Sequence, residues 1–335
     1  MAITYRQTPL SPQERQHRRR LLSMTLVTCL VLVMIASTIH VVMLGQRRLG
    51  DMRKLATYDL IEENKRVRAA GEDIALQETH EAGRSIDNAG YTVAETERLL
   101  SREQWEELAT LVPIAAGAFL MGTNFERADA QDKPQHTVTL PAYYIDKYLV
   151  TNAQYARFVA ATHRRPPINW KDGHIPQGEL MNPVTMVTWT DANEYATWAG
   201  KRLPHEAEYE KAGRGSDGRR WPWGDKMDPT RLNTYYTVGS ATNVTGYPQG
   251  ASIYGVYGLS GNVAEWTADD LLPYAGAKDA QDNLSRYSKV LRGGSWKGDP
   301  FSTSLYHRDY ALPNHATDFY GFRCASDVAK TARVK

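Results

Sequence analysis

The hydrophobic pattern is strongest near the start of the chain. Residues 21–44, LLSMTLVTCLVLVMIASTIHVVML, contain no Lys, Arg, Asp or Glu. At a helical rise of about 1.5 Å per residue they span roughly 36 Å, which is enough to cross the hydrocarbon core of a bilayer. A cleaved signal peptide has a shorter apolar region followed by small residues, whereas this run continues into GQRRLGDMRK. The pattern predicts an uncleaved transmembrane signal anchor over 21–44.

Basic residues flank the predicted anchor on both sides. Residues 1–20 end in the run RQHRRR, and four more basic residues follow within 45–54. The slight excess before the anchor favours a cytoplasmic N-terminus under the positive-inside rule. We therefore expect a single-pass protein of a bacterial inner membrane, with its C-terminal domain in the periplasm.

Residues 45–110 are polar and rich in Glu, Arg, Ala and Leu, which are good helix formers. Glycines interrupt the helical pattern at Gly71, Gly83 and Gly90, and no clean heptad repeat continues past the first of them. The pattern predicts a helical connector over 45–110. Two forms stay open, a short coiled coil and a stalk that holds the next domain off the membrane or packs on a partner.

From residue 111 the pattern changes to short segments, and Tyr, Trp, Gly and Pro become frequent. Alternation of apolar and polar residues predicts strands over 117–123 and 136–150, the second broken at Pro141. Helical periodicity returns only in three short stretches, namely 151–162, 190–200 and 203–215. We predict an α+β domain over 111–328 with two or three helices, mostly turns and short strands in its second half, and a short tail over 329–335.

The ends of these helices follow from their polar residues. Thr190 or Asp191 is expected to cap the helix over 190–200, because both side chains can accept hydrogen bonds from free backbone amides. Tyr195 and Trp198 are expected to face the core from the same helix.

Composition excludes several classes of protein. The net charge is +2, and no basic stripe follows the anchor, so nucleic-acid binding has no support. The only cysteines are Cys29, inside the predicted anchor, and Cys324, near the C-terminus. We therefore expect no disulfide, and a zinc or iron–sulfur site built from several cysteines is excluded.

A series of motifs makes the second half of the chain more specific. In order they are FLMGT, KPQHTVTLPAYYIDKYLVTNAQYARFV, NPVTMVTWTDANEYATWAGKRLPHEAEYEKAGRG, WPWGD, YGLSGNVAEWTAD, VLRGGSW and GFRCA. The whole series resembles the formylglycine-generating enzyme (sulfatase-modifying factor) family over about residues 112–328. The resemblance implies a compact α+β fold related to C-type lectins, with little regular secondary structure.

The resemblance also implies a chemistry, an oxidase that converts a substrate cysteine to formylglycine. Active members bind copper(I) through two cysteines that follow the Gly-Gly-Ser-aromatic motif, because soft thiolates select a soft monovalent ion. Counted from Trp296, these positions fall on Gly298 and Thr303. Neither is a good copper ligand, so we expect no catalytic residues of this type and no copper.

The family receives an extended peptide on the surface around this motif. The residues that match that surface are Ser295, Trp296, Gly298, Thr303 and Arg308. A groove retained without thiolates would suit a binding module. The alternative is that these residues persist only because the fold needs them.

The resemblance further implies two calcium sites. The first matches the carbonyls of Gly261 and Val263 and the carboxylate of Glu265, and the second matches Asn233 and Thr234. The first lacks one of its usual Asn or Asp ligands, and the loop that completes the second contains no Asp or Glu. Calcium is thus expected from the resemblance alone, and no other cofactor is predicted.

Three functions stay open. The leading one is a non-catalytic, membrane-anchored binding or scaffold subunit of a larger bacterial membrane complex. The second is a periplasmic enzyme of different chemistry on the same fold, such as an oxidase that modifies proteins or metabolites. Its candidate residues are His205, His307, Asp299, Asp309 and Arg308. The third is a true formylglycine-generating oxidase with relocated ligands.

Overall fold

The computed structural model describes residues 90–277 and 287–329. The predicted basic terminus over 1–20, the anchor over 21–44 and most of the connector over 45–110 lie outside these residues. Within the described ranges, no helix has the length and apolar character needed to cross a membrane. The anchor stays a prediction.

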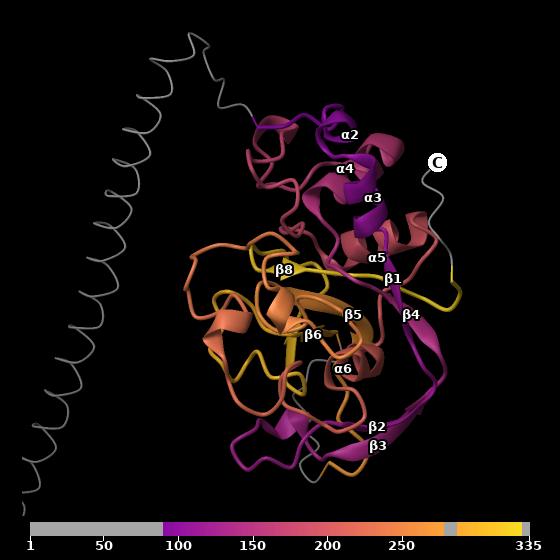
Figure 1. Cartoon of the computed structure of the whole chain (residues 1–335), viewed down its shortest axis with the longest axis vertical. Helices are drawn as coiled ribbons and strands as arrows, with labels where there is room; N and C mark the ends of the chain where they lie inside the picture. Colours follow the sequence, from indigo (N-terminus) through magenta and orange to yellow (C-terminus); the bar gives the residue numbers. More distant parts are fainter. Residues whose placement is uncertain (1–89, 278–286, 330–335) are drawn as a thin grey trace, which may run out of the picture. The chain divides into compact units, whose positions relative to one another are not determined.

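The chain enters the described domain through two short helices, α2 (Thr96–Leu99) and α3 (Arg102–Leu108) (Figure 1). A capping box fixes the start of α3, because Ser101 accepts from the amide of Gln104 while the Gln104 side chain accepts from the amide of Ser101. Leu100 and Leu108 belong to the main hydrophobic core. These helices thus pack as part of the domain, although the pattern led us to place them in the connector.

Two small antiparallel units follow. Strand β1 (Leu111–Ile114) pairs with β4 (Tyr143–Asp146), which pairs with β9 (Ala325–Ser326). Strands β2 (Gly117–Met121) and β3 (His136–Leu140) form a separate pair. The predicted strands over 117–123 and 136–150 are confirmed, and the break at Pro141 separates β3 from β4.

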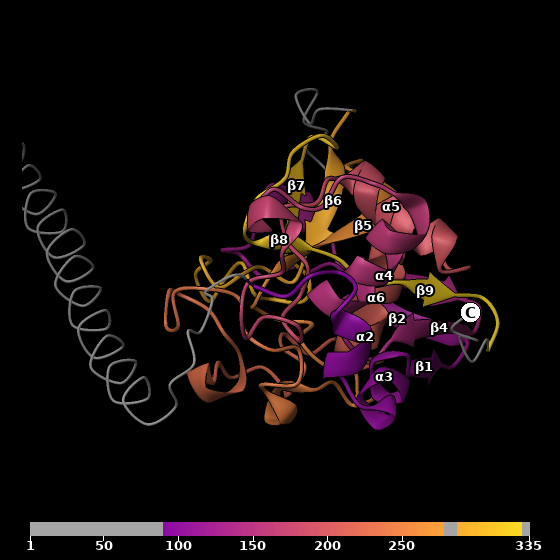
Figure 2. The ribbon, with the colours of Figure 1, turned by 90° about the horizontal axis from the view of Figure 1, so that it is seen from above.

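The second half of the chain builds a four-stranded sheet in the order β7-β6-β5-β8. Its strands are β5 (Ala264–Asp270), β6 (Lys289–Arg292), β7 (Arg308–Ala311) and β8 (Tyr320–Gly321). All neighbours are antiparallel except β5 and β8. Figure 2 shows these four strands grouped together, apart from β1, β4 and β9. The architecture confirms the α+β class.

The helices α4 (Asn152–Thr162) and α5 (Trp189–Trp198) confirm two of the predicted helical stretches. Helix α5 begins one residue earlier than expected, because Thr188 caps it by accepting from the amide of Asp191. Neither Thr190 nor Asp191 is the cap residue. Tyr195 is buried as predicted, but Trp198 is 41% exposed, and its ring packs at a tilt against Phe158 and Tyr195.

The third predicted helix, α6 (Glu206–Arg214), packs against β2, β3, β5 and β6 and is almost entirely buried. Four short 3-10 turns complete the described elements, namely η1 (Ala130–Asp132), η2 (Lys171–Gly173), η3 (Pro229–Arg231) and η4 (Pro248–Gly250). Much of the remaining chain is irregular, so polar side chains rather than backbone ladders satisfy many of its backbone groups.

Candidate functional site

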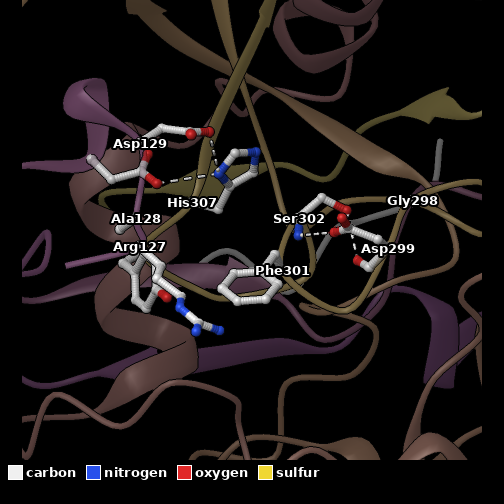
Figure 3. A pocket seen from close by; sticks show the side chains of 10 residues that line it. Arg127, Ala128, Asp129, Gly298, Asp299, Phe301, Ser302 and His307 are labelled. Carbon is white, nitrogen blue, oxygen red and sulfur yellow. Dashed lines mark hydrogen bonds and ion pairs between the residues drawn. The ribbon is translucent and has the colours of Figure 1, made fainter. Parts of the chain in front are cut away.

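A pocket of about 660 Å³ lies where two distant segments meet, one before β3 and one before β7 (Figure 3). Its lining residues are Arg127, Ala128, Asp129, Asp132, Gly298, Asp299, Phe301, Ser302, Tyr306 and His307. The second segment follows the Gly-Gly-Ser-Trp motif directly. The pocket therefore lies beside the region in which the sequence placed a cleft.

The two glycines of the motif are required by the close packing of this loop. Gly293 and Gly294 have φ values of +89° and +66°, which side chains rarely adopt. A Cβ on Gly293 would collide with the hydroxyl of Tyr209, and one on Gly294 would lie 2.6 Å from the carbonyl oxygen of Ser302. The platform is thus built from backbone, and its shape depends on these two positions.

Gly298 and Thr303, the two positions matched to copper ligands, are both committed to the fold. Gly298 lines the pocket, and its carbonyl accepts from Thr234 Oγ1 at 2.7 Å and from the amide of Tyr235 at 2.9 Å. Thr303 is fully buried, and its hydroxyl donates to the carbonyl of Pro300 and accepts from Trp221 Nε1. Neither residue presents a side-chain ligand to the pocket.

Ser295 and Trp296 are each 6% exposed and do not line this pocket. The Ser295 hydroxyl accepts from the amide of Lys297 at 3.3 Å. Trp296 packs edge-on against Tyr236, and its indole nitrogen donates to the carbonyl of Asp318 at 3.4 Å. In this structure both residues hold the loop in shape.

Arg308 was expected in the cleft, but the structure buries it away from the pocket. Its side chain is 1% exposed, and it makes a two-pronged ion pair with Glu206, with both N···O distances at 2.8 Å. It also donates to the carbonyls of Gln131 and Leu272. A guanidinium that neutralises a buried carboxylate is not free to bind a ligand.

Of the remaining candidates, His307 and Asp299 line the pocket, whereas His205 and Asp309 do not. His205 lies at the start of α6, where its Nδ1 is 3.1 Å from Asp269 Oδ1. Asp309 accepts from the amide of Tyr310 at the edge of the sheet. The five residues therefore form no single cluster.

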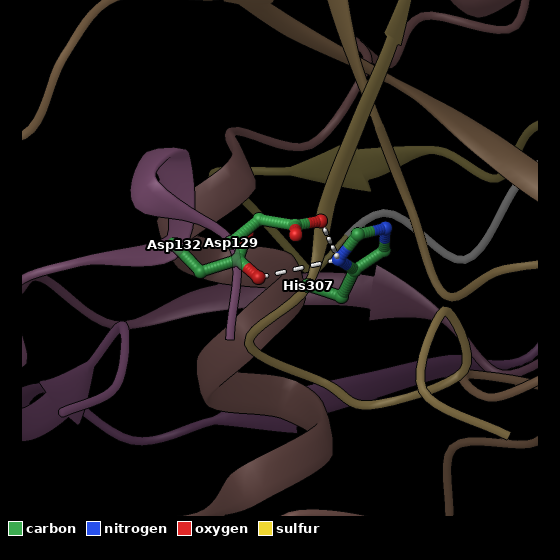
Figure 4. A group of neighbouring side chains, drawn as sticks. All are labelled: Asp129, Asp132 and His307. Atoms are coloured by element: carbon green, nitrogen blue, oxygen red, sulfur yellow. Dashed lines mark hydrogen bonds and ion pairs between the residues drawn. The ribbon is translucent and has the colours of Figure 1, made fainter. Parts of the chain in front are cut away.

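The pocket brings His307 together with two aspartates that we had not singled out. His307 Nδ1 lies 3.2 Å from Asp132 Oδ2 and 3.8 Å from Asp129 Oδ2 (Figure 4). Burial alone would lower the pKa of His307, but the hydrogen bond and negative charge of Asp132 outweigh burial and raise it. The sequence signal was weak, since the two aspartates lie three residues apart in a segment without periodicity, and Asp132 is 175 residues from the histidine.

The first calcium set does not fit a calcium ion. Glu265 is fully buried, and Arg323 already neutralises its carboxylate with N···O distances of 2.7 and 2.8 Å. Tyr209 donates to the same carboxylate at 3.0 Å. The other two predicted ligands are the backbone carbonyls of Gly261 and Val263, which carry no formal charge. Without a free carboxylate, this set lacks the charged oxygen ligand on which calcium sites rely.

The second calcium set offers one oxygen of the right kind. Asn233 is 1% exposed, and its Oδ1 is buried without a hydrogen-bond partner among the described residues. The carbonyl of Thr234, however, already accepts from both the amide and the hydroxyl of Thr237. A single free amide oxygen does not supply the six to eight oxygens that calcium takes. The residues present do not fit the ion at either predicted position.

The fold and the motif series together define the class of protein. Residues 96–328 match the family described as "Sulfatase-modifying factor enzyme 1-like domain". The chain belongs to this family, which the resemblance had indicated. The matched range includes α2 and α3, in agreement with their packing on the core.

Individual relatives differ in what their names say of activity. The chain is 31% identical to the "Formylglycine-generating enzyme" of Thermomonospora curvata, over 68% of this chain and 97% of that protein. It is also 31% identical to "Inactive C-alpha-formylglycine-generating enzyme 2" of Mus musculus, over 66% and 86% of the two chains. Identity at this level thus does not separate named enzymes from a relative named inactive.

Two further comparisons bear on length and fold. The "Serine/threonine-protein kinase Pkn1" of Chlamydia trachomatis is 35% identical over 66% of this chain, which spans only 39% of that protein. Among solved structures, PvdO from Pseudomonas aeruginosa is similar with a TM-score of 0.53 and 28% identity, covering 65% of this chain and 94% of that one. These matches support the family fold for the described domain.

Proposed function

We propose that this protein is a membrane-anchored member of the family that lacks the copper oxidase chemistry and serves as a binding or scaffold subunit of a larger bacterial membrane complex. The residues at Gly298 and Thr303 carry the proposal. Neither can supply a thiolate. The hydrogen bonds of both residues are made within the domain and stabilise the loop. The relative named inactive supports only the loss of activity, and the anchor and the scaffold role are part of the proposal.

The chain has no other thiol suited to the pocket. Cys324 is fully buried in the main core, and its amide donates to Asp146 Oδ2 at 2.9 Å. Burial raises the pKa of this thiol well above its usual range, so it stays protonated. Cys29 lies within the predicted anchor. Among the described residues, a copper(I) site of two thiolates therefore has no source of ligands at the pocket.

The proposed membrane anchor is supported by the sequence, and the proposed partner is supported by the surface of the domain. The apolar run over 21–44 would hold the chain in the inner membrane, with the domain in the periplasm. Next to the motif, Tyr235 and Tyr236 are 68% and 58% exposed, and both have positive φ values. Strained, exposed aromatic residues are typical of recognition surfaces, which favours a binding role.

The loss of oxidase chemistry can be tested directly. The full chain in detergent, given copper, oxygen and a peptide with the sulfatase-type cysteine motif, is expected to form no aldehyde by mass spectrometry and to bind no copper(I). The matched variant Gly298→Cys/Ser302→Ala/Thr303→Cys restores two thiols and removes the hydroxyl with which a Cβ at 298 would collide. This variant is expected to bind copper(I). Aldehyde formation by the unmodified chain would refute the proposal.

The scaffold role requires a partner. We expect the chain, extracted from bacterial membranes in mild detergent, to co-purify with one or a few membrane proteins in constant ratio. A variant that lacks 21–44 should appear in the soluble fraction, which provides the control for anchoring. Purification from membranes as a lone monomer would count against the role.

A further inference from the structure

Asp129, Asp132 and His307 form a group of three ionisable side chains at one corner of the pocket, hereafter the pocket triad. Asp129 is 66% exposed, while Asp132 and His307 are 1% and 17% exposed. Among the described residues, the only ion-pair partner of either carboxylate is His307. One Asp132 oxygen accepts from the backbone amide of Arg308, and the other faces the imidazole. The triad therefore holds two carboxylates without a guanidinium or ammonium.

The spacing of the triad is that of ligands around one metal ion. Ligand atoms about 2.1 Å from an ion lie about 3.0 Å apart at right angles and about 3.4 Å apart at tetrahedral angles. The distances from His307 Nδ1 to the two carboxylates are 3.2 and 3.8 Å, and one donor atom from each residue falls within 4.8 Å of the others. Figure 4 shows Nδ1 facing both carboxylates. Small side-chain rotations would bring all three atoms onto one ion.

A second observation points to a ligand in the same pocket. Tyr306 lines the pocket and is 4% exposed, yet its hydroxyl is buried and has no hydrogen-bond partner among the described residues. A buried hydroxyl without a partner is costly, and such groups are otherwise rare. The hydroxyl itself is not exposed to the pocket, but a small rotation of the Tyr306 ring would let water on a bound ion, or a ligand oxygen, provide the missing partner.

We propose that Asp129, Asp132 and His307 bind one divalent transition-metal ion. One imidazole with two carboxylates suits Zn²⁺, Mn²⁺ or Fe²⁺ better than copper(I), which prefers thiolates, or Ca²⁺, which takes oxygen ligands only. Three protein ligands leave a coordination position for water or for a ligand oxygen in the pocket. The site uses no residue of the copper positions and is independent of the proposed scaffold function.

The simpler alternative is a His–Asp ion pair. That pair requires only Asp132, so exposed Asp129 should then contribute little. A metal site requires all three residues. Asp129 is therefore the residue that distinguishes the two interpretations, and its exposure means that a substitution there should leave the fold intact.

The test is Zn²⁺ titration by calorimetry on the full chain, in detergent, free of tag and metal. We expect one ion per chain in the unmodified protein, with at least tenfold weaker binding in Asp129→Asn and in His307→Gln. Asp299→Asn is the matched control, because Asp299 lines the same pocket outside the triad, and an asparagine oxygen can still accept from the amide of Ser302. Replacement with Co²⁺ should give visible absorption bands that both triad variants lose.

Two results would overturn the proposal. One is the absence of stoichiometric binding of Zn²⁺ by the unmodified chain. The other is binding by Asp129→Asn that is as tight as binding by Asp299→Asn, which would assign the affinity to another site. If His307→Gln fails to fold, as judged by circular dichroism, the Asp129→Asn result decides alone.

Discussion

Acidic residues occupy two contrasting environments in this domain. Around α6, each buried carboxylate meets a guanidinium: Glu206 pairs with Arg308, Glu210 with Arg214 and Arg292, and Glu265 on β5 with Arg323. In the pocket triad, the only ion-pair partner of Asp129 and Asp132 among the described residues is the imidazole of His307. The paired carboxylates each meet a guanidinium within the fold, whereas the triad carboxylates lie at the wall of a pocket.

This contrast separates structural charge from charge that can serve a ligand. Two of the buried pairs, Glu206–Arg308 and Glu210–Arg292, join α6 to the four-stranded sheet. Asp132 belongs to both environments, since it accepts from the amide of Arg308 and also faces His307. The network of buried ion pairs thus helps to position Asp132. A substitution that disrupts this network should therefore change the geometry of the pocket triad.

The largest expected effect comes from breaking one of the buried pairs. Arg308→Met should lower the free energy of unfolding by about 3–5 kcal/mol, because Glu206 would be left buried without a partner. Urea denaturation followed by circular dichroism measures the change. A loss under about 1 kcal/mol would mean that Arg308 is free for a ligand, as the sequence had suggested.

The double variant Glu206→Gln/Arg308→Met is the control for this result. It removes both charges and leaves only neutral groups, so its loss should be smaller, about 1–3 kcal/mol. A loss equal to that of the single variant would show that packing of the arginine stem, rather than its charge, holds the site together.

Much of the fold was predictable because its signals are local. The strands near 117–123 and 136–150 follow from alternation, and the helix over 151–162 follows from its helical period. The first residue of α5 was not predictable, because Thr188, Thr190 and Asp191 are all suitable cap residues. Only the structure identifies Thr188 as the cap. The exposure of Trp198 depends on tertiary packing that periodicity does not report.

The site was less predictable. The sequence indicated Gly298 and His307, which do line the pocket. It could not show that the Arg308 side chain is held in a buried ion pair with Glu206. An arginine in a motif looks the same whether it is buried in an ion pair or faces a ligand. Asp129 and Asp132 reach the pocket only because the chain before β3 folds back beside the segment before β7, which no local pattern encodes.

The smallest expected effect concerns a partly exposed ion pair in which, as in the pocket triad, a carboxylate faces an imidazole. Its members are His205, whose side chain is 55% exposed, and Asp269. The hydrogen bond to Asp269 raises the pKa of His205, although burial and the nearby Arg202 oppose the rise. A raised pKa stabilises the fold fully below about pH 6.5, the ordinary histidine value, and the gain disappears as pH rises through the raised pKa.

We therefore expect the free energy of unfolding to fall between about pH 6 and 8, with a few tenths of a kcal/mol of the fall due to this exposed pair. His205→Asn should remove that part while keeping a favourable residue at the start of α6. The pKa of His307 is also raised, but its contribution is common to both proteins and cancels in their difference. If the difference between the two proteins is constant across this range, the pair contributes nothing to folding. Asp269, whose side chain is 30% exposed, would then be as available to a ligand as the carboxylates of the pocket triad.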